Sequence, residues 1–83
     1  MYYVYIIQNE QKQLYTGYTS DLRRRIKEHN RGISKSTRNS KWELIYYEAY
    51  KSEKDARLRE KQLKRSSGSK RWLKSRIKNS MNS

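Results

Sequence analysis

The segment over residues 2–8 constrains the fold of this 83-residue chain most strongly, because it is apolar on both sides of an extended backbone. Its sequence, YYVYIIQ, is rich in residues that favour strands, and successive side chains of a strand point to opposite faces. A strand with two apolar faces is stable only where other elements cover both of them. We therefore expect a strand within a sheet that is covered on both sides.

The rest of the sequence predicts two further strands and three helices. In chain order, the expected elements are a polar turn at 9–12, a strand at 13–16, a helix at 22–30, a strand at 42–50, a helix from about 52 to 65 and a helix at 70–78. The fold class is then α+β, a three-stranded antiparallel sheet flanked by helices in the order β-β-α-β-α-α. The long strand at 42–50 is a candidate for the sheet centre. Residues 1–78 are expected to form one domain, and 79–83 a frayed tail.

Small residues and caps set the expected boundaries of these elements. Gly17 allows a tight exit of the backbone from the second strand, and Gly32 ends the first helix. N-caps are available at 19–21 for the first helix, and Ser52 with Asp55 resembles a capping box for the second. Among the tyrosines, the expected core members are Tyr2, Tyr46 and Tyr47, whereas Tyr18 and Tyr50 fit either the core or stacking with bases.

Composition excludes several classes of site. The chain has no cysteine and one histidine, so neither a disulfide framework, a thiolate zinc site nor a multi-histidine site is possible. The longest apolar run is far too short to cross a bilayer and lacks the flanks of a signal peptide. We therefore expect no membrane partner and a cytoplasmic location, with association with the nucleoid as an option.

The net charge of +13 lies entirely in residues 21–83, because residues 1–20 are neutral. Basic residues in blocks are the usual electrostatic footprint of a nucleic-acid-binding protein. A solvated basic surface, a membrane and an acidic protein partner are the alternatives. The residues expected to bind nucleic acid are Arg23, Arg24, Lys35, Thr37, Arg38, Lys41, Lys64, Lys70 and Arg71.

Four residues near the start of the chain are of types that can surround a phosphate. Tyr5 and Tyr15 fall on facing hairpin strands, and Arg25 and His29 are i, i+4 partners directed toward the sheet. An arginine supplies a permanent fork of donors for a phosphate. A histidine can accept or relay a proton, although a single histidine is more often structural. Plain core packing is the alternative for the two tyrosines.

Glu60 is the candidate metal ligand, because it shares an expected apolar helix stripe with Ala56 and Leu63. A carboxylate at such a position is costly unless it is paired or binds a cation. One carboxylate can hold Mg²⁺ or Mn²⁺ together with waters and a substrate phosphate. The alternative is an ion pair with one of the many neighbouring basic residues.

Taken together, these residues resemble the GIY-YIG nuclease domain of homing endonucleases, some restriction enzymes and the excinuclease of nucleotide excision repair. The likeness rests on YTGYTSDLRRRIKEHNRG at 15–32, the threonine and arginine at 37–38, and DARLREKQLK at 55–64, and the chain is most similar to the small stand-alone bacterial proteins of that superfamily. The resemblance implies that Tyr5 and Tyr15 are the motif tyrosines and Gly17 the motif glycine. It further implies that Arg25 and His29 are catalytic and that Glu60 binds one Mg²⁺ or Mn²⁺ ion.

The resemblance implies metal-dependent hydrolysis of phosphodiesters, with Tyr15 or a base acting through water activating the nucleophile and Tyr5 orienting it. The chain departs from the pattern at Tyr3, which replaces the first motif glycine, and it has no clear equivalent of the asparagine that follows the glutamate, for which Asn79 is the nearest candidate. Without a second DNA-binding domain, specificity is expected to come from DNA structure or a protein partner.

Three functions therefore stand as hypotheses. The first is a structure-directed or weakly specific DNA endonuclease acting in repair or recombination. The second is a non-catalytic nucleic-acid-binding module of the same fold, holding DNA or, through 30–41 and 70–78, structured RNA. The third, a small ribosome-associated protein, explains the charge but not the combination of Tyr5, Tyr15, Arg25 and Glu60.

Overall fold

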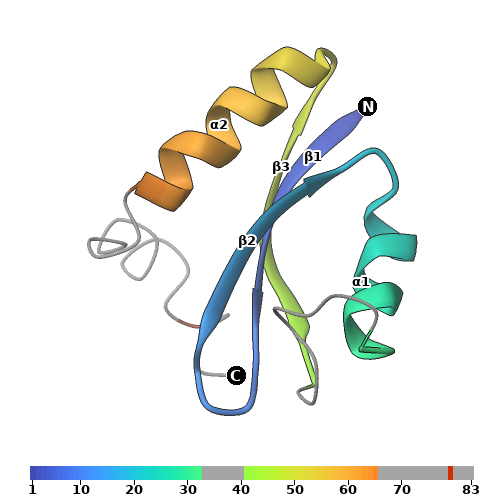
Figure 1. Ribbon diagram of the computed structural model, residues 1–83, viewed down its shortest axis with the longest axis vertical. Coiled ribbons are helices and arrows are strands. Elements are labelled where there is room, and N and C mark those ends of the chain that lie inside the picture. Colours follow the sequence, from blue (N-terminus) through green and yellow to red (C-terminus); the bar gives the residue numbers. More distant parts are fainter. Residues whose placement is uncertain (33–40, 66–78, 80–83) are drawn as a thin grey trace.

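The computed structural model describes residues 1–32, 41–65 and 79 (Figure 1). Its elements are, in order, β1 (Tyr2–Gln8), β2 (Leu14–Thr19), α1 (Leu22–Asn30), β3 (Glu43–Tyr50) and α2 (Glu53–Arg65). The three strands form one antiparallel sheet, so the predicted α+β class and the order β-β-α-β-α are confirmed. The predicted helix at 70–78 lies outside the described residues.

The strand β1 occupies the middle of the sheet, whose order is β2-β1-β3. The prediction that 42–50 forms the sheet centre was wrong. Val4, Ile6 and Ile7 of β1 are fully buried, as a strand with two apolar faces requires. β3 instead has no fully buried residue, combines exposed with half-buried residues and carries two glutamates, a pattern suited to an edge strand.

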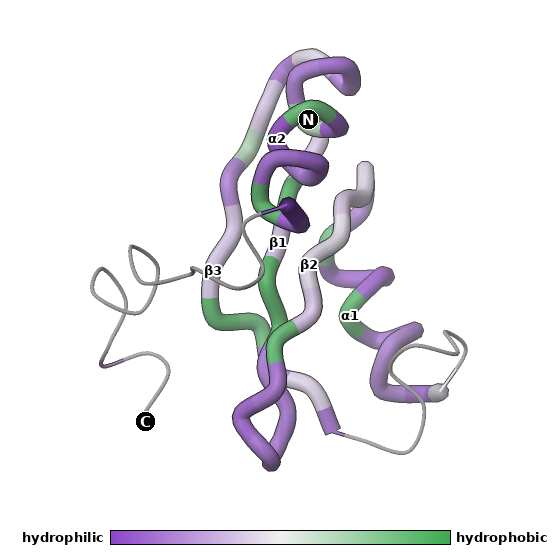
Figure 2. The backbone as a smooth tube through the Cα atoms, turned by 60° about the vertical axis from the view of Figure 1, so that its left-hand side comes forward, coloured by the Kyte–Doolittle hydropathy of each residue, from purple (hydrophilic) through white to green (hydrophobic). Residues whose placement is uncertain are grey.

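The two helices cover opposite faces of the sheet, α1 on one side and α2 on the other (Figure 1). The core under α1 contains Tyr5, Ile7 and Trp42, and the core under α2 contains Val4, Ile6, Ala56 and Leu63. Figure 2 shows hydrophobic residues concentrated along β1, whereas most of α1 and α2 is hydrophilic. The central strand therefore supplies apolar side chains to both cores.

A change of register in β3 distributes its side chains between these two cores. Ile6 pairs with Tyr46, but the next residue, Ile7, pairs with Leu44, so one residue of β3 is unpaired at this point. As a result Leu44 packs with the α1-side core, whereas Tyr46 packs with the α2-side core. Without this bulge the two side chains would share one face.

The turn between β1 and β2 forms as the polar segment at 9–12 predicts. The buried side chain of Asn9 accepts hydrogen bonds from the backbone N–H groups of Gln11 and Gln13, at 3.0 and 2.9 Å. Lys12 has a φ of 66°, a left-handed conformation that closes the turn. The second strand is longer than the expected 13–16, because the pairing with β1 continues to Thr19.

The ends of α1 follow the predicted capping residues. The side chain of Asp21 accepts a hydrogen bond from the backbone N–H of Arg24 at 3.1 Å and is the N-cap. Gly32, with a φ of 76°, ends the helix and donates its N–H to the carbonyl of His29. The helix α2 starts beside Ser52, whose carbonyl accepts from Ala56 N.

The tyrosines divide differently from the prediction. Tyr2 and Tyr46 pack against the α2-side core as expected, but Tyr47 is 53% exposed and does not belong to a core. Tyr47 is on the α1 side of β3, where α1 does not reach over it. Tyr18 and Tyr50 also pack against the α2-side core. No helix within the described part of the chain is long and apolar enough to span a membrane.

Candidate active site

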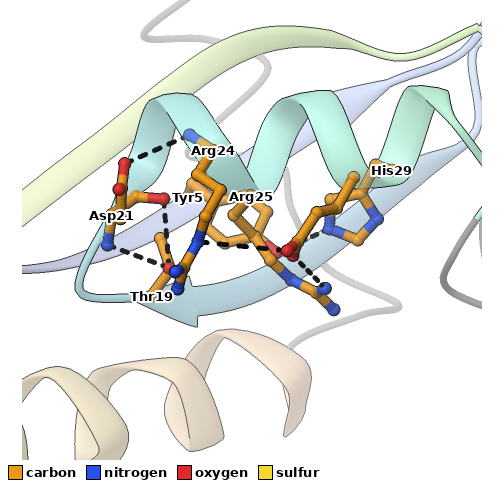
Figure 3. Close-up of polar contacts among 7 residues, drawn as sticks. Tyr5, Thr19, Asp21, Arg24, Arg25 and His29 are labelled. Atoms are coloured by element: carbon orange, nitrogen blue, oxygen red, sulfur yellow. Dashed lines mark hydrogen bonds and ion pairs between the residues drawn. The ribbon is translucent and has the colours of Figure 1, made fainter.

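Tyr5 is the centre of a polar cluster beneath α1. Its side chain is 1% exposed, and its hydroxyl lies 2.7 Å from Nε2 of His29 (Figure 3). Burial raises the pKa of the Tyr5 phenol to about 12, although the neighbouring Arg25 guanidinium acts in the opposite direction. Tyr5 is therefore a neutral phenol at physiological pH, with its hydroxyl held in one position by the imidazole.

Gly17 leaves the space that the Tyr5 ring occupies. The two residues are paired across β1 and β2, and a Cβ added at Gly17 would lie 2.5 Å from the Tyr5 hydroxyl oxygen. Real Cβ atoms are essentially never found so close to another heavy atom. The expected role of Gly17 in a tight exit was wrong, since the residue lies within β2; the position needs glycine because the tyrosine crosses it.

His29 is fully buried and is held on the sheet side of α1. Burial, followed by the positive charge of Arg25, lowers the pKa of His29 to about 4. The imidazole is therefore neutral at physiological pH. One ring nitrogen faces the Tyr5 hydroxyl, and the tautomer decides which of the two groups donates the hydrogen bond.

Arg25 leaves the same side of α1 as His29, and its guanidinium lies beside Tyr5 (Figure 3). Its Nη1 donates to Oε1 of Glu28 at 3.0 Å. The side chains of both residues are 30% exposed, so the pair lies at the boundary between the core and solvent. The second nitrogen edge of such a guanidinium fork suits an anion such as a phosphate.

Tyr15 approaches His29 from the second strand. Its ring packs edge-to-face on the imidazole with a centroid distance of 5.0 Å, and on Trp42 at 6.4 Å. Tyr5 makes a similar edge contact with the imidazole at 5.7 Å. The structure thus brings together Tyr5, Tyr15 and His29, with Arg25 next to them.

Glu60 lies on α2 between the buried residues Ala56 and Leu63, and its side chain is 19% exposed. One carboxylate oxygen is 3.3 Å from Nζ of Lys64, so the alternative of an ion pair with a neighbouring base is realised. Its negative charge also contributes to raising the pKa of Tyr5. The α2 carboxylate is therefore within electrostatic reach of the cluster under α1, although the sheet separates the two helices.

The residues present fit a metal ion that keeps most of its waters. The described residues contain no cluster of three or more His, Cys, Asp or Glu side chains. An all-protein cage is thus not available in this part of the chain. A single carboxylate such as Glu60 suits Mg²⁺ or Mn²⁺, which commonly bind through one or two carboxylates together with substrate phosphates.

Comparison with known proteins identifies the family. The GIY-YIG catalytic domain matches residues 1–75. The chain belongs to the GIY-YIG family. The GIY-YIG domain suggests nuclease activity, which is the hydrolysis of phosphodiesters in nucleic acids.

Individual relatives in the GIY-YIG family agree with this assignment. UPF0213 protein CPE1444 of Clostridium perfringens is 40% identical over 67 residues, covering 78% of this chain and 72% of the relative. UPF0213 protein HQ_3675A of Haloquadratum walsbyi is 40% identical over 65 residues, covering 76% and 73%. The solution NMR structure of UPF0213 protein BH0048 from Bacillus halodurans covers 90% of this chain and 84% of that chain, with a TM-score of 0.58 and 38% identity. The predicted similarity to small GIY-YIG proteins is confirmed.

The residues predicted to bind nucleic acid are only partly described. The exposed ones are Arg23, Arg24, Lys41 and Lys64. Lys35, Thr37, Arg38, Lys70 and Arg71 lie outside the described residues. The exposed set comes from α1, the segment just before β3 and the end of α2.

Sequence reasoning missed two residues that position the GIY-YIG site. Glu28 holds Arg25, and the i, i+3 spacing of opposite charges on a predicted helix was the available signal. Asn30 links the end of α1 to β3, because its amide accepts from Trp42 N at 2.7 Å and donates to Trp42 O at 3.0 Å. Nothing in the local sequence indicated that second contact, which spans twelve residues.

Proposed function

We propose that this GIY-YIG protein is a metal-dependent DNA endonuclease of structure-directed or weak sequence specificity. The observation that carries the proposal is the buried hydrogen bond between Tyr5 and His29, with the Arg25 guanidinium beside it. Core packing alone does not require a fully buried neutral histidine to be hydrogen-bonded to a phenol. Nor does it require a partly exposed permanent cation beside them. The arrangement is suited to placing a phosphate and a water molecule.

In this proposal Arg25 binds the scissile phosphate and stabilises the charge that grows on it in the transition state. Glu28 holds the guanidinium in place through the 3.0 Å contact. A deprotonated Tyr15, or another base acting through a water molecule, would take up the proton of the attacking water. Tyr5, fixed by His29, orients that water through its hydroxyl.

Glu60 would hold the single Mg²⁺ or Mn²⁺ ion, in exchange for its contact with Lys64. Such an ion polarises the phosphoryl oxygen and stabilises the leaving alkoxide when it is bound. The half-buried position of Glu60 on α2, between the buried residues Ala56 and Leu63, supports this assignment.

Weak sequence specificity follows from the kind of cations around the site. Arg23, Arg24 and Lys64 are exposed side chains suited to phosphate oxygens, and phosphate contacts carry no direct sequence information. The protein would act in DNA repair or recombination, and it would do so in the cytoplasm, near the nucleoid. A protein partner would direct it to its substrate. DNA is favoured over RNA because the likeness is to DNA endonucleases.

The second candidate is a non-catalytic nucleic-acid-binding module. The ion pair between Glu60 and Lys64 favours it, because a carboxylate already satisfied by a lysine has no need of a metal. In that case the exposed basic residues alone would carry the function. Cleavage assays separate the two candidates.

Nicking of branched, damaged and plain DNA with Mg²⁺, Mn²⁺ or EDTA tests the nuclease. We expect cleavage only with a metal, and a loss on the order of 10²–10³-fold in Arg25→Ala, as for removal of a key charge-stabilising donor. A similar loss is expected in Glu60→Gln. Lys61→Ala and Glu53→Gln are the controls, because they remove one positive and one negative charge from exposed positions on α2 that have no assigned role in the site.

The controls are expected to keep the cleavage rate at saturating DNA, with folding checked by thermal melts. If Arg25→Ala and Glu60→Gln nick as fast as the wild-type protein while folding normally, the nuclease assignment is wrong. DNA binding that persists in all variants, without cleavage under any metal condition, would support the binding module instead.

A further inference from the structure

A groove lies between α1 and β3, on the flank of α1 away from Arg25. It is an open groove of about 640 Å³, lined by residues of β1, α1 and β3. Arg23 and Lys27 reach it one helical turn apart, whereas Arg25 leaves α1 about 200° around the helix from Arg23. The groove is therefore separate from the cluster around His29, although the two share α1.

An aromatic pair forms part of the groove. The rings of Tyr3 and Tyr47 pack edge-to-face with centroids 6.0 Å apart. Tyr47 is 53% exposed, and Leu44 and Ile26 add apolar surface beside it. An edge-to-face pair leaves ring faces uncovered, and an uncovered tyrosine face is a stacking surface for a flat group.

Tyr3 contributes one ring of this pair to the groove. It stands at the position of the first glycine in the GIY-YIG motif, where a glycine would contribute no ring. Tyr3 and Tyr47 come from the neighbouring strands β1 and β3, on the face that α1 covers only in part. The substitution therefore adds an aromatic group to a surface that the family motif leaves without one.

Two cations border the aromatic pair. The side chains of Arg23 and Lys27 are exposed and make no ion pair or hydrogen bond with other described residues. Among the described residues that line the groove, Asp21 supplies the single carboxylate, which accepts from the N–H of Arg24 as the N-cap of α1. The groove thus combines apolar aromatic surface with net positive charge, which complements a base linked to phosphates.

We propose that this groove binds an unpaired nucleotide, with the base on Tyr47 and Tyr3 and the neighbouring phosphates on Arg23 and Lys27. This inference rests on the proposed function and names its substrate class, namely DNA that carries single-stranded nucleotides beside the cleaved bond. A paired base cannot enter, because its faces are already covered within the duplex. Branched, flapped or gapped DNA would be selected over intact duplex.

Binding of single strands in EDTA tests the groove without cleavage. The probes are a fluorescein-labelled ten-nucleotide thymidine strand and a strand with the same phosphates whose internal nucleotides are abasic. We expect the wild-type protein to bind the thymidine strand about 5- to 150-fold more tightly, the range for stacking of one base. Tyr47→Ala should lose this preference, Tyr47→Trp should keep it, and Leu58→Ala on α2 is the control for an exposed apolar residue.

The cations give a different signature. Arg23→Ala and Lys27→Ala should weaken the binding of both strands by the same factor. Each substitution should also reduce the slope of log affinity against log salt by about one. The proposal would be wrong if the wild-type protein bound the two strands equally. It would also be wrong if Tyr47→Ala reduced the affinity for both strands by the same factor. A dimer in sedimentation that Tyr47→Ala dissociates would also overturn it, because a second copy would then occupy the groove.

The two proposals fail separately. If nicking depends on Arg25 and Glu60 but Tyr47→Ala keeps the base preference, the nuclease stands and the nucleotide groove is wrong. If Tyr47→Ala loses the base preference while Arg25→Ala nicks like the wild-type protein, the groove stands and the catalytic assignment is wrong.

Discussion

His29 is fully buried beside a guanidinium, and its pKa is lowered to about 4 from the ordinary 6.5. Between these two pH values the unfolded chain binds a proton at this imidazole and the folded chain does not. The free energy of unfolding therefore falls as pH falls from 6.5 to 4, by about 3 kcal/mol in all, and levels off below that.

Denaturant unfolding at pH 7, 6 and 5 measures this effect. His29→Gln removes the titrating group, so its stability should change little over this range, even if it is less stable throughout. The slope against pH, rather than the absolute stability, is the diagnostic quantity. Parallel pH curves for the two proteins would contradict a neutral buried imidazole.

At individual positions, the sequence suggested candidate residues but not the contacts between them. The i, i+4 spacing of Arg25 and His29 correctly indicated that His29 is buried toward the sheet. The hydrogen bond to Tyr5 joins residues 24 positions apart, and such a contact depends on how α1 packs on β1. For the same reason, the need for Gly17 appeared only once the Tyr5 ring was placed above it.

The carboxylate of Glu48 on β3 binds Arg59 of α2 and so links that helix to the sheet. The Arg59 guanidinium donates to both oxygens of Glu48, from Nε at 2.8 Å and from Nη2 at 3.2 Å. The hydroxyls of Tyr46 and Tyr50 donate to the same carboxylate. Burial raises the pKa of Glu48, but these donors outweigh burial and hold the pKa below its usual value.

Glu48→Gln should therefore lower the free energy of unfolding at pH 7 by roughly 1–3 kcal/mol, since Arg59 loses its charged partner. Because the pKa is lowered in the folded state, the difference from the wild-type protein should shrink as pH falls through that lowered pKa. Glu43→Gln, on the same strand but exposed, is the control and should change stability by no more than about 0.5 kcal/mol. Equal effects of the two substitutions would show that the contact between Arg59 and Glu48 does not contribute to the free energy of unfolding.

The elements were more predictable than their arrangement. The bounds of β1, α1 and α2 follow from hydrophobic period, caps and Gly32, all of which are local. The prediction of β3 as the central strand was wrong because strand length does not determine which strand has neighbours on both edges. The bulge opposite Ile6 and Ile7 was equally absent from the local pattern.

For the molecule as a whole, the net charge of +13 predicts strongly salt-dependent binding to nucleic acid. If about five phosphates are neutralised on a duplex, the slope of log affinity against log salt is about −4.5, and affinity falls several hundred-fold between 50 and 200 mM salt. Fluorescence anisotropy with a labelled duplex at four salt concentrations measures this slope. Affinity that is constant across this range would contradict electrostatic binding of nucleic acid.

Local information in the chain was sufficient for the α+β class and the family, because side-chain period, capping residues and motif spacing depend only on neighbours along the chain. Packing settled the rest. The position of α1 and α2 on the sheet determines which strand is central and which tyrosine hydrogen-bonds to His29. It also determines that Tyr47 is exposed beside Tyr3 rather than buried. Those contacts join residues far apart in sequence, and their geometry exists only after the two faces of β1 have been buried.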